Sequence, residues 1–182
     1  METECSEDVD WTELPLCQLT AHIVTAHHGY LKRELPRLKI ELQRIYRSAQ
    51  EPDRSAIVQL PGLLDVLHSE LEMHMYKEEM ILFVHIERYE SAVDAGLTAP
   101  PVPFGTVANP ITMMEHEHDT AISALRSMRT STGGYPVRLD IAEDLRALYA
   151  GLQELEQDLH VHIHLENNIL FPRALKLESA NR

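Results

Sequence analysis

The 182-residue sequence is acidic, with 29 Asp and Glu against 16 Lys and Arg and a formal net charge of −13. This charge argues against nucleic acid or a membrane as a partner, because phosphates and anionic lipids would be repelled. No apolar run approaches the roughly 20 residues that a membrane span needs. The opening residues, METECSEDVDW, lack the basic and apolar regions of a signal peptide, so we expect a cytoplasmic protein.

Apolar residues recur at spacings of three and four along most of the chain, which predicts helices. The predicted helices cover residues 16–49, 55–89, 111–129 and 137–176. Pro36 predicts a kink in the first, and Pro61 a possible interruption of the second. Residues 95–110 hold four prolines and two glycines and form a long connection. The fold expected is all-α, an up-and-down antiparallel four-helix bundle over residues 16–176, with an acidic flexible tail (1–15) and a short tail (177–182).

The eleven histidines include a repeated pattern. The segment LEMHMYKEEMILF (71–83) aligns with LHVHIHLENNILF (159–171) at an offset of 88 residues. This offset pairs His74 with His162 and Glu78 with Glu166. A similar offset of 90 residues pairs two further histidines, His28 and His118. Each half of the chain therefore offers one histidine followed by a His-x-x-x-Glu pair, which predicts a pseudo-twofold arrangement.

The spacing within each pair places both side chains on one face of a helix, one turn apart. Two such helices facing each other supply two imidazoles and two carboxylates, and carboxylates can bridge two metal ions. His28 and His118 would add one nitrogen from each remaining helix. A nitrogen and oxygen donor set without thiolate suits iron or manganese, and suits zinc less well when carboxylates bridge. The sequence thus predicts a dinuclear metal site built from His28, His74, Glu78, His118, His162 and Glu166.

Ligands at one level of an antiparallel helix pair should be equidistant from the turn between the helices. The midpoint of His28 and His74 is residue 51, inside the predicted turn. The midpoint of His118 and His162 is residue 140, several residues past the Gly133-Gly134 turn signal, so the second pair fits less well.

Metal-bound histidines usually donate their second ring N–H to an acceptor. Glu70 precedes His74 by four residues and Asp158 precedes His162 by four, and we expect these carboxylates to serve as the acceptors. His85 returns to the face of His74 but lies further along the helix, where it lines an access route or packs. We expect ordinary structural roles for the other histidines, which are His22, His27, His68, His116, His160 and His164.

Four segments, AHHGYLKRELPRL (26–38), LEMHMYKEEMILF (71–83), MMEHEHD (113–119) and LENNILFPRAL (165–175), resemble the hemerythrin-like HHE cation-binding domain. Within that class the chain is similar to the iron-sulfur-cluster repair family. The resemblance implies a bundle holding two non-haem iron ions with an oxo or hydroxo bridge. It places the ligands on the six residues named above, with Glu78 and Glu166 bridging. It also implies partners: nitric oxide, oxygen or peroxide, and damaged iron-sulfur proteins.

The sequence departs from the family in three places, one of which is Val84-His85 after the first Leu-Phe, where the family often has proline. Longer repair proteins carry an amino-terminal domain with adjacent cysteines, whereas only about 15 residues, including Cys5, precede the bundle predicted here. Members often have a further histidine after the first helix, where this chain has Tyr46, about 27 Å of helix beyond His28. Three alternatives to repair stay open: reversible oxygen or nitric oxide binding or sensing, a di-iron enzyme that decomposes peroxide or nitric oxide, and a metal-free structural adaptor. The oligomeric state is open as well.

Overall fold

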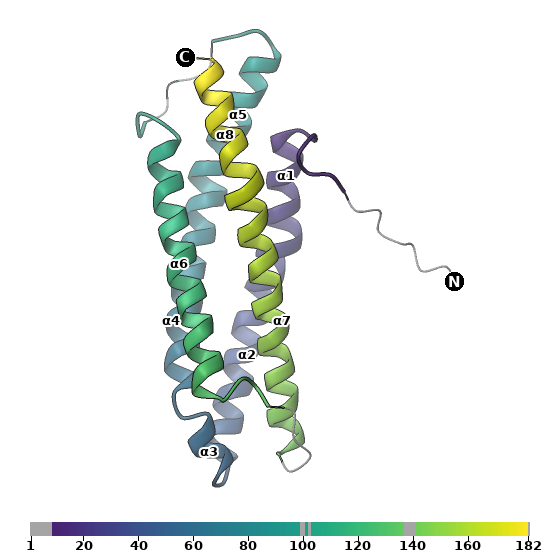
Figure 1. The fold of residues 1–182 in the computed structure, drawn as a ribbon, viewed down its shortest axis with the longest axis vertical. Helices are drawn as coiled ribbons and strands as arrows, with labels where there is room; N and C mark the ends of the chain where they lie inside the picture. The colour runs from purple at the N-terminus through teal and green to yellow at the C-terminus, as the bar shows by residue number, and fades with distance from the viewer. Residues whose placement is uncertain (1–8, 99–100, 102, 137–140, 182) are drawn as a thin grey trace, which may run out of the picture.

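The computed structural model describes residues 9–98, 101, 103–136 and 141–181. Most of these residues belong to four long helices, which we call bundle helices 1 to 4 (Figure 1). Bundle helix 1 joins α1 (Leu16–His22), η1 (Ile23–His28) and α2 (Gly29–Ser48). A short α3 (Asp53–Ala56) precedes bundle helix 2, which joins α4 (Leu60–Lys77), η2 (Glu78–Leu82) and α5 (Phe83–Asp94). Bundle helix 3 is α6 (Ala108–Ser131), and bundle helix 4 joins α7 (Glu143–Leu165), η3 (Glu166–Leu170) and α8 (Phe171–Ala180).

The predicted all-α bundle is confirmed, and the boundaries differ in instructive ways. Bundle helix 1 continues through Pro36. The predicted second helix is interrupted at residues 57–59, between α3 and α4. Pro61 lies just after this break, in the first turn of α4, where a missing N–H costs nothing. Bundle helix 4 begins at Glu143, and its predicted start at residue 137 lies outside the described residues. None of the described helices is long and apolar enough to cross a membrane.

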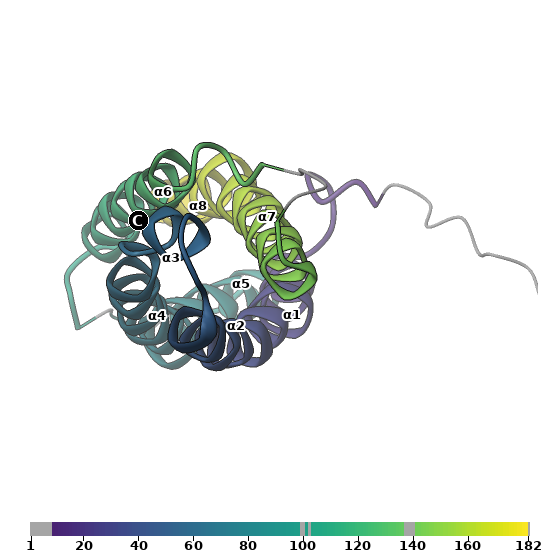
Figure 2. The same ribbon diagram turned by 90° about the horizontal axis from the view of Figure 1, so that it is seen from below.

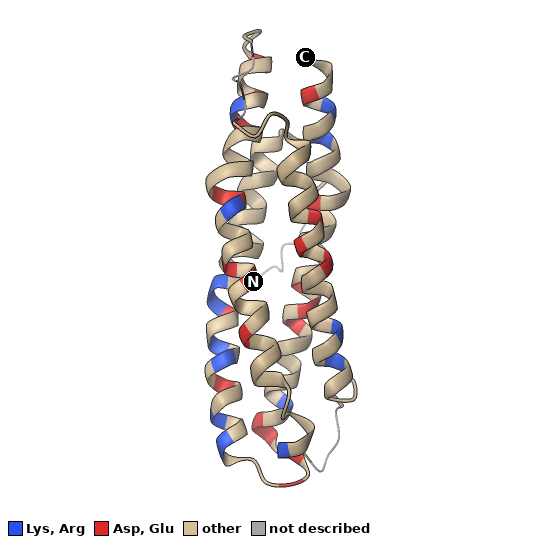
Figure 3. Ribbon diagram, turned by 90° about the vertical axis from the view of Figure 1, so that its left-hand side faces the viewer, with Lys and Arg blue, Asp and Glu red and all other residues tan. Residues whose placement is uncertain are grey.

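The four bundle helices form a ring when seen along the long axis (Figure 2), and α4 lies between α2 and α6. Their inward faces follow the three- and four-residue spacing of the sequence; on α2 the buried residues are Leu31, Leu35, Leu38, Leu42 and Ile45. Positions of both charge signs occur along the length of the bundle helices (Figure 3). The apolar interior is thus closed on all sides by amphipathic helices.

The apolar core is divided into two clusters. The larger cluster fills the end of the bundle nearest α3 and includes Leu31, Leu71 and Leu159. The smaller cluster fills the other end and includes Phe83 and Phe171. Between them lies a layer of buried polar side chains, four histidines and two glutamates. This layer has apolar contacts above and below, so water is kept from it along the bundle axis.

The pseudo-twofold repeat extends to the helix ends. Glu90 accepts hydrogen bonds from the first backbone N–H groups of α1, at Leu16 (2.6 Å) and Cys17 (2.9 Å). Glu178, 88 residues later, accepts from the Val107 N–H (3.2 Å) and the Thr106 hydroxyl (2.6 Å) just before α6. Both carboxylates satisfy N–H groups that have no partner inside their helix. The two halves therefore share their capping contacts as well as their histidines.

Three π-helical segments interrupt the described bundle helices, and all three adjoin the polar layer. η1 ends on His28, η2 begins at Glu78 and η3 begins at Glu166. η2 and η3 are themselves 88 residues apart. Single π turns inside α-helices occur frequently at functional sites. The apolar periodicity of the sequence does not predict these segments.

Candidate metal centre

The structure brings together all six residues that the repeat predicts as ligands. Bundle helices 1 and 3 each contribute one histidine, and bundle helices 2 and 4 each contribute a histidine and a glutamate one turn further on. All six side chains are buried, and both glutamates are fully so. They form two groups of four that share both glutamates and could each hold a metal ion: His28, Glu78, His162 and Glu166, and His74, Glu78, His118 and Glu166.

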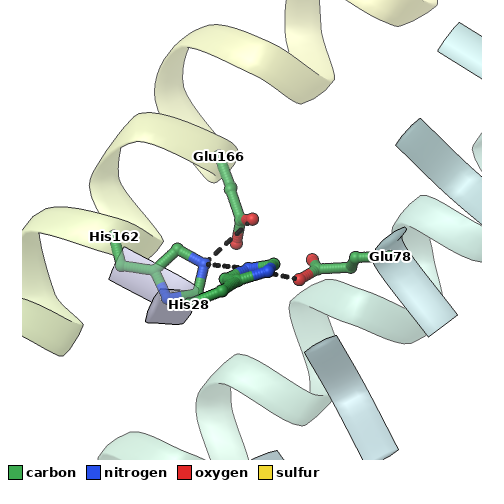
Figure 4. A group of neighbouring side chains, drawn as sticks. All are labelled: His28, Glu78, His162 and Glu166. Carbon is green, nitrogen blue, oxygen red and sulfur yellow. Dashed lines mark hydrogen bonds and ion pairs between the residues drawn. The ribbon is translucent and has the colours of Figure 1, made fainter. Parts of the chain in front are cut away.

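The first group joins bundle helices 1, 2 and 4 (Figure 4). The Nε2 atoms of His28 and His162 lie 3.2 Å apart. His28 Nε2 lies 3.3 Å from Glu78 Oε2, and His162 Nε2 lies 3.0 Å from Glu166 Oε1. Four donor atoms from three helices therefore converge on one point. We call this group position 1.

The second group, position 2, uses the other oxygen of each carboxylate. His74 Nε2 lies 3.1 Å from Glu78 Oε1, and His118 Nε2 lies 3.0 Å from Glu166 Oε2. The two Nε2 atoms are 3.1 Å apart. Each glutamate thus presents one oxygen to each position, which is the arrangement that a carboxylate needs to bridge two ions.

The donor atoms fit two metal ions. All four oxygens of Glu78 and Glu166 are buried and accept no well-aligned hydrogen bond. Buried carboxylate oxygens without partners are costly, and a metal ion removes that cost. Ligand atoms held about 2.1 Å from one ion at right angles lie about 3 Å apart, which matches the spacings at both positions. Two nitrogens with two bridging carboxylates form a set suited to iron.

Protons take up part of this charge when no metal is bound. Burial disfavours the charged His74 ring, but the charges of Glu78 and Glu166 and the contact with Glu117 outweigh it and raise the pKa of His74 to about 9. Burial also opposes ionisation of Glu166, yet the neighbouring His162 and His118 hold the pKa of this carboxyl well below its usual value. The pKa of His162 is raised mainly because the charge of Glu166 exceeds the effect of burial. A metal ion entering this cluster has to displace protons.

The outer ring nitrogen of His28 has a carboxylate partner from the next helix. His28 Nδ1 donates to Glu79 Oε1 (2.8 Å), and Glu79 also accepts from the Lys32 ammonium (2.6 and 2.8 Å). Such a partner fixes the ring orientation and the tautomer, with Nε2 free to bind metal. Glu79 follows the shared Glu78 directly in the sequence.

His74 has a similar partner, and the predicted one was wrong. His74 Nδ1 donates to Glu117 Oε2 (2.9 Å) on α6, and Glu117 forms a salt bridge with Lys77. Glu70, the expected acceptor, is exposed on the surface. With Nε2 directed at the bundle axis, Nδ1 faces the neighbouring helix, so an acceptor one turn back on the same helix is out of line.

The two histidines of the second half have weaker outer contacts. His118 Nδ1 lies 2.9 Å from the Asn167 side-chain oxygen. His162 Nδ1 is buried and has no hydrogen-bond partner. Asp158, its predicted acceptor, pairs with His27 instead (2.9 Å), so this prediction was wrong too. His27, expected to be ordinary, is buried with its ring parallel to that of His162, at 5.6 Å between centroids.

The remaining histidines stay out of both metal positions. His160 and His164 are exposed, as helical phase predicts, and bond to the Glu156 carbonyl and to Asn168. His85 packs edge-on against Phe104, and His22 stacks on Trp11, which lies before α1. Tyr46 is partly buried and packs against the larger apolar cluster, far along α2 from the polar layer. Cys5 lies outside the described residues.

A pocket of about 340 Å³ reaches position 2 from the surface between α4 and α6. His74 and His118 line its inner end, and Lys77 and Glu117 line its side. A small molecule could therefore approach this position without unfolding a helix. Its apolar wall includes Leu71 and Ala121.

The outer partners could have been found from the repeat. Glu79 and Asn167 each follow a shared glutamate and are 88 residues apart, and Glu117 and His27 each precede a ligand histidine and are 90 residues apart. What identifies these residues is that each is the sequence neighbour of a candidate ligand, at equivalent places in both halves. Helical spacing within a single helix does not contain this information.

The fold and the convergent histidines and glutamates define a hemerythrin-like bundle with a buried cation-binding layer. The model of the hemerythrin HHE cation binding domain matches residues 19–174, and the chain belongs to this family.

The chain is also similar to curated relatives named iron-sulfur cluster repair protein YtfE. It is 37% identical to that of Musicola paradisiaca over 180 residues, which cover 98% of this chain and 74% of the relative. The protein of Edwardsiella ictaluri is 39% identical over 166 residues, 91% of this chain and 69% of the relative. That of Yersinia pseudotuberculosis is 34% identical over 181 residues, 98% of this chain and 74% of the relative.

Proposed function

We propose that this protein binds two iron ions and serves in the repair of damaged iron-sulfur clusters. His28 and His162 hold one ion, His74 and His118 hold the other, and the two shared glutamates bridge them. The observation that carries the proposal is that each glutamate offers one unpartnered buried oxygen to each group of histidines. The repair role is supported by the printed names of relatives that match nearly the whole chain.

Bound iron supplies redox-active, Lewis-acidic positions to which nitric oxide, oxygen or peroxide can bind. An oxo or hydroxo bridge between the ions belongs to the proposed centre. The chain's own groups do the rest: Glu79 and Glu117 orient two of the rings, and the apolar clusters on either side exclude water. Damaged iron-sulfur proteins are the proposed macromolecular partners, in the cytoplasm.

A second candidate function is reversible binding or sensing of nitric oxide or oxygen, or the enzymatic decomposition of peroxide or nitric oxide. The pocket between α4 and α6 favours it, because a small molecule entering there meets the two histidines of position 2. Repair needs iron to leave the protein, whereas a sensor or an enzyme needs iron to stay. Iron retention during function therefore separates the two.

The metal site is tested by the variant Glu78→Gln, which keeps the side chain's shape and removes the shared charge. We expect two irons per chain in the unaltered protein and loss of both in the variant. Glu72→Gln, an exposed glutamate on the same helix, is the matched control and should keep both irons. Two irons per chain in Glu78→Gln would contradict the assignment.

The repair role is tested by adding the iron-loaded protein to a dehydratase whose cluster nitric oxide has destroyed. We expect recovery of the dehydratase together with a matching loss of iron from this protein. The Glu72→Gln protein should restore the dehydratase equally, and the Glu78→Gln protein should not. Reversible uptake of nitric oxide without iron loss or dehydratase recovery would favour the second function and refute repair.

A further inference from the structure

The two metal positions differ in how their histidines are held from outside. Of the four outer Nδ1 atoms, those of His28 and His74 meet carboxylates, and that of His118 meets an amide oxygen. Only His162 Nδ1, among these four, is buried without a partner. A ligand histidine without its outer acceptor has a less basic ring and a less fixed orientation.

The internal repeat identifies the residue that breaks the pattern. In the three partnered cases the acceptor comes from another bundle helix and sits next to a ligand in the sequence, as Glu79, Glu117 or Asn167. The residue equivalent to Glu117 in the first half is His27, since 117 − 27 = 90. His27 therefore stands where His162 would find its acceptor.

His27 does not fill that role. Its ring lies parallel to the His162 ring, at an interplanar angle of 6°, and its Nδ1 is engaged by Asp158 Oδ1 at 2.9 Å. The other oxygen, Asp158 Oδ2, is buried and also lacks a hydrogen-bond partner. His162 Nδ1 and Asp158 Oδ2 thus both stay without a partner, and no hydrogen bond fixes the orientation of the His162 ring.

The other outer hydrogen bonds do not compensate. Position 1 has one carboxylate-held histidine, with Lys32 on the far side of Glu79, and position 2 has one, with Lys77 on the far side of Glu117. These two arrangements match in charge and in kind. Among the outer hydrogen bonds, the contrast that remains is His162, with no acceptor, against His118, with the Asn167 oxygen.

We propose that position 1, between His28 and His162, is the one that releases its iron first, and that His27 is the positioning residue that makes it labile. This inference rests on the proposed binding of two irons and adds which ion the protein gives away. Loss of an outer partner typically weakens metal binding by about 10- to 100-fold. We expect a difference of that size between the two positions.

The test is iron release to a coloured ferrous chelator, followed by stopped flow with the full iron-loaded chain. The unaltered protein should release iron in two phases of equal amplitude, with rates about 10- to 100-fold apart. Crystals frozen after the fast phase should show anomalous iron scattering between His74 and His118 only. Release in one phase, or iron left between His28 and His162, refutes the proposal.

Variants that exchange the two halves sharpen the test. His27→Glu copies Glu117, and His27→Gln supplies a neutral acceptor; both should slow the fast phase about tenfold or more. Glu117→His copies His27 and should accelerate the slow phase. Ala26→Glu adds the same charge at an exposed neighbour and should leave both rates unchanged. An unchanged fast phase in both His27 variants would overturn the role of His27.

The outcomes separate this inference from the proposed function. A protein that never binds two irons fails the proposed function, and the release assay then has no second phase to measure. If the protein binds two irons and releases them at one rate, the proposed function stands and only the inferred difference between the two positions is refuted. Iron content measured before mixing distinguishes the two cases.

Discussion

Without metal, the buried layer holds its two carboxylates in place with protonated imidazoles, so its contribution to stability depends on pH. His74 has a pKa of about 9 in the folded protein, against 6.5 for an ordinary histidine. Because the folded-state pKa is the higher one, the stabilisation is fully present below pH 6.5 and is lost as pH rises through 9. At about 1.4 kcal/mol per pH unit, the difference corresponds to about 3 kcal/mol from His74 alone.

The pKa of His162 is shifted in the same direction, and those of Glu78 and Glu166 are shifted downward. The carboxylates therefore stabilise the fold above about pH 4.5 and lose this effect in acid. The metal-free protein should be most stable between about pH 4.5 and 6.5, and less stable by about 3 kcal/mol at pH 9 and above.

Urea unfolding of the metal-free protein across pH 5 to 10, followed by circular dichroism, measures this loss directly. His74→Gln should flatten the decline between pH 6.5 and 9, since the variant has no proton to lose at that position. The iron-loaded protein should behave differently, because metal-bound imidazoles carry no such proton and iron binding strengthens as protons become scarce. A metal-free protein whose stability is level from pH 6.5 to 9 would refute the charge assignment.

Two further predictions concern the scaffold. Gly151→Ala would place a methyl group 2.8 Å from Cδ2 of the buried Leu38. The resulting overpacking should cost about 1–3 kcal/mol, more than the gain of about 1 kcal/mol in helix propensity. Urea unfolding of this variant should therefore show a lower free energy of unfolding. Gly62→Ala, with no atom within 4 Å, is its control and should stabilise the protein slightly; equal effects at both sites would refute the packing argument. Glu90→Ala and Glu178→Ala should each lower the free energy of unfolding by about 1–2 kcal/mol through lost caps, with iron content unchanged, and no loss in either variant would contradict the capping role.

The convergence of the six candidate ligands was predictable because the geometry of each pair is local. A His-x-x-x-Glu pair lies on one face of any α-helix, and its recurrence after 88 residues indicates that two helices present the same face. Residue 51, the midpoint of His28 and His74, lies in the turn between α2 and α3, as equal heights of the two histidines require. Its counterpart, residue 140, lies outside the described residues.

The hydrogen-bond partners were missed because they depend on the packing of different helices. Glu70 and Asp158 satisfy the one-turn spacing within their own helices. A ring whose Nε2 points to the bundle axis, however, directs Nδ1 to the neighbouring helix, where Glu117 accepts the hydrogen bond of His74. The π segments were missed for a related reason. Their wider turns are compatible with the same apolar periodicity, and the ligand layer, rather than local propensity, marks where they occur.

The sharing of the two glutamates has a consequence for how the molecule is assembled. Each metal position draws two ligands from residues before the 95–107 connection and two from residues after it, so neither half contains a complete site. An ion bound there is a cross-link between two similar halves. A symmetric pair of identical half-chains would carry the same residue at both equivalent places, and could not combine Glu117 on one side with His27 on the other. Joining the halves in one polypeptide is what would allow two neighbouring ions to be held with different strengths, as we propose.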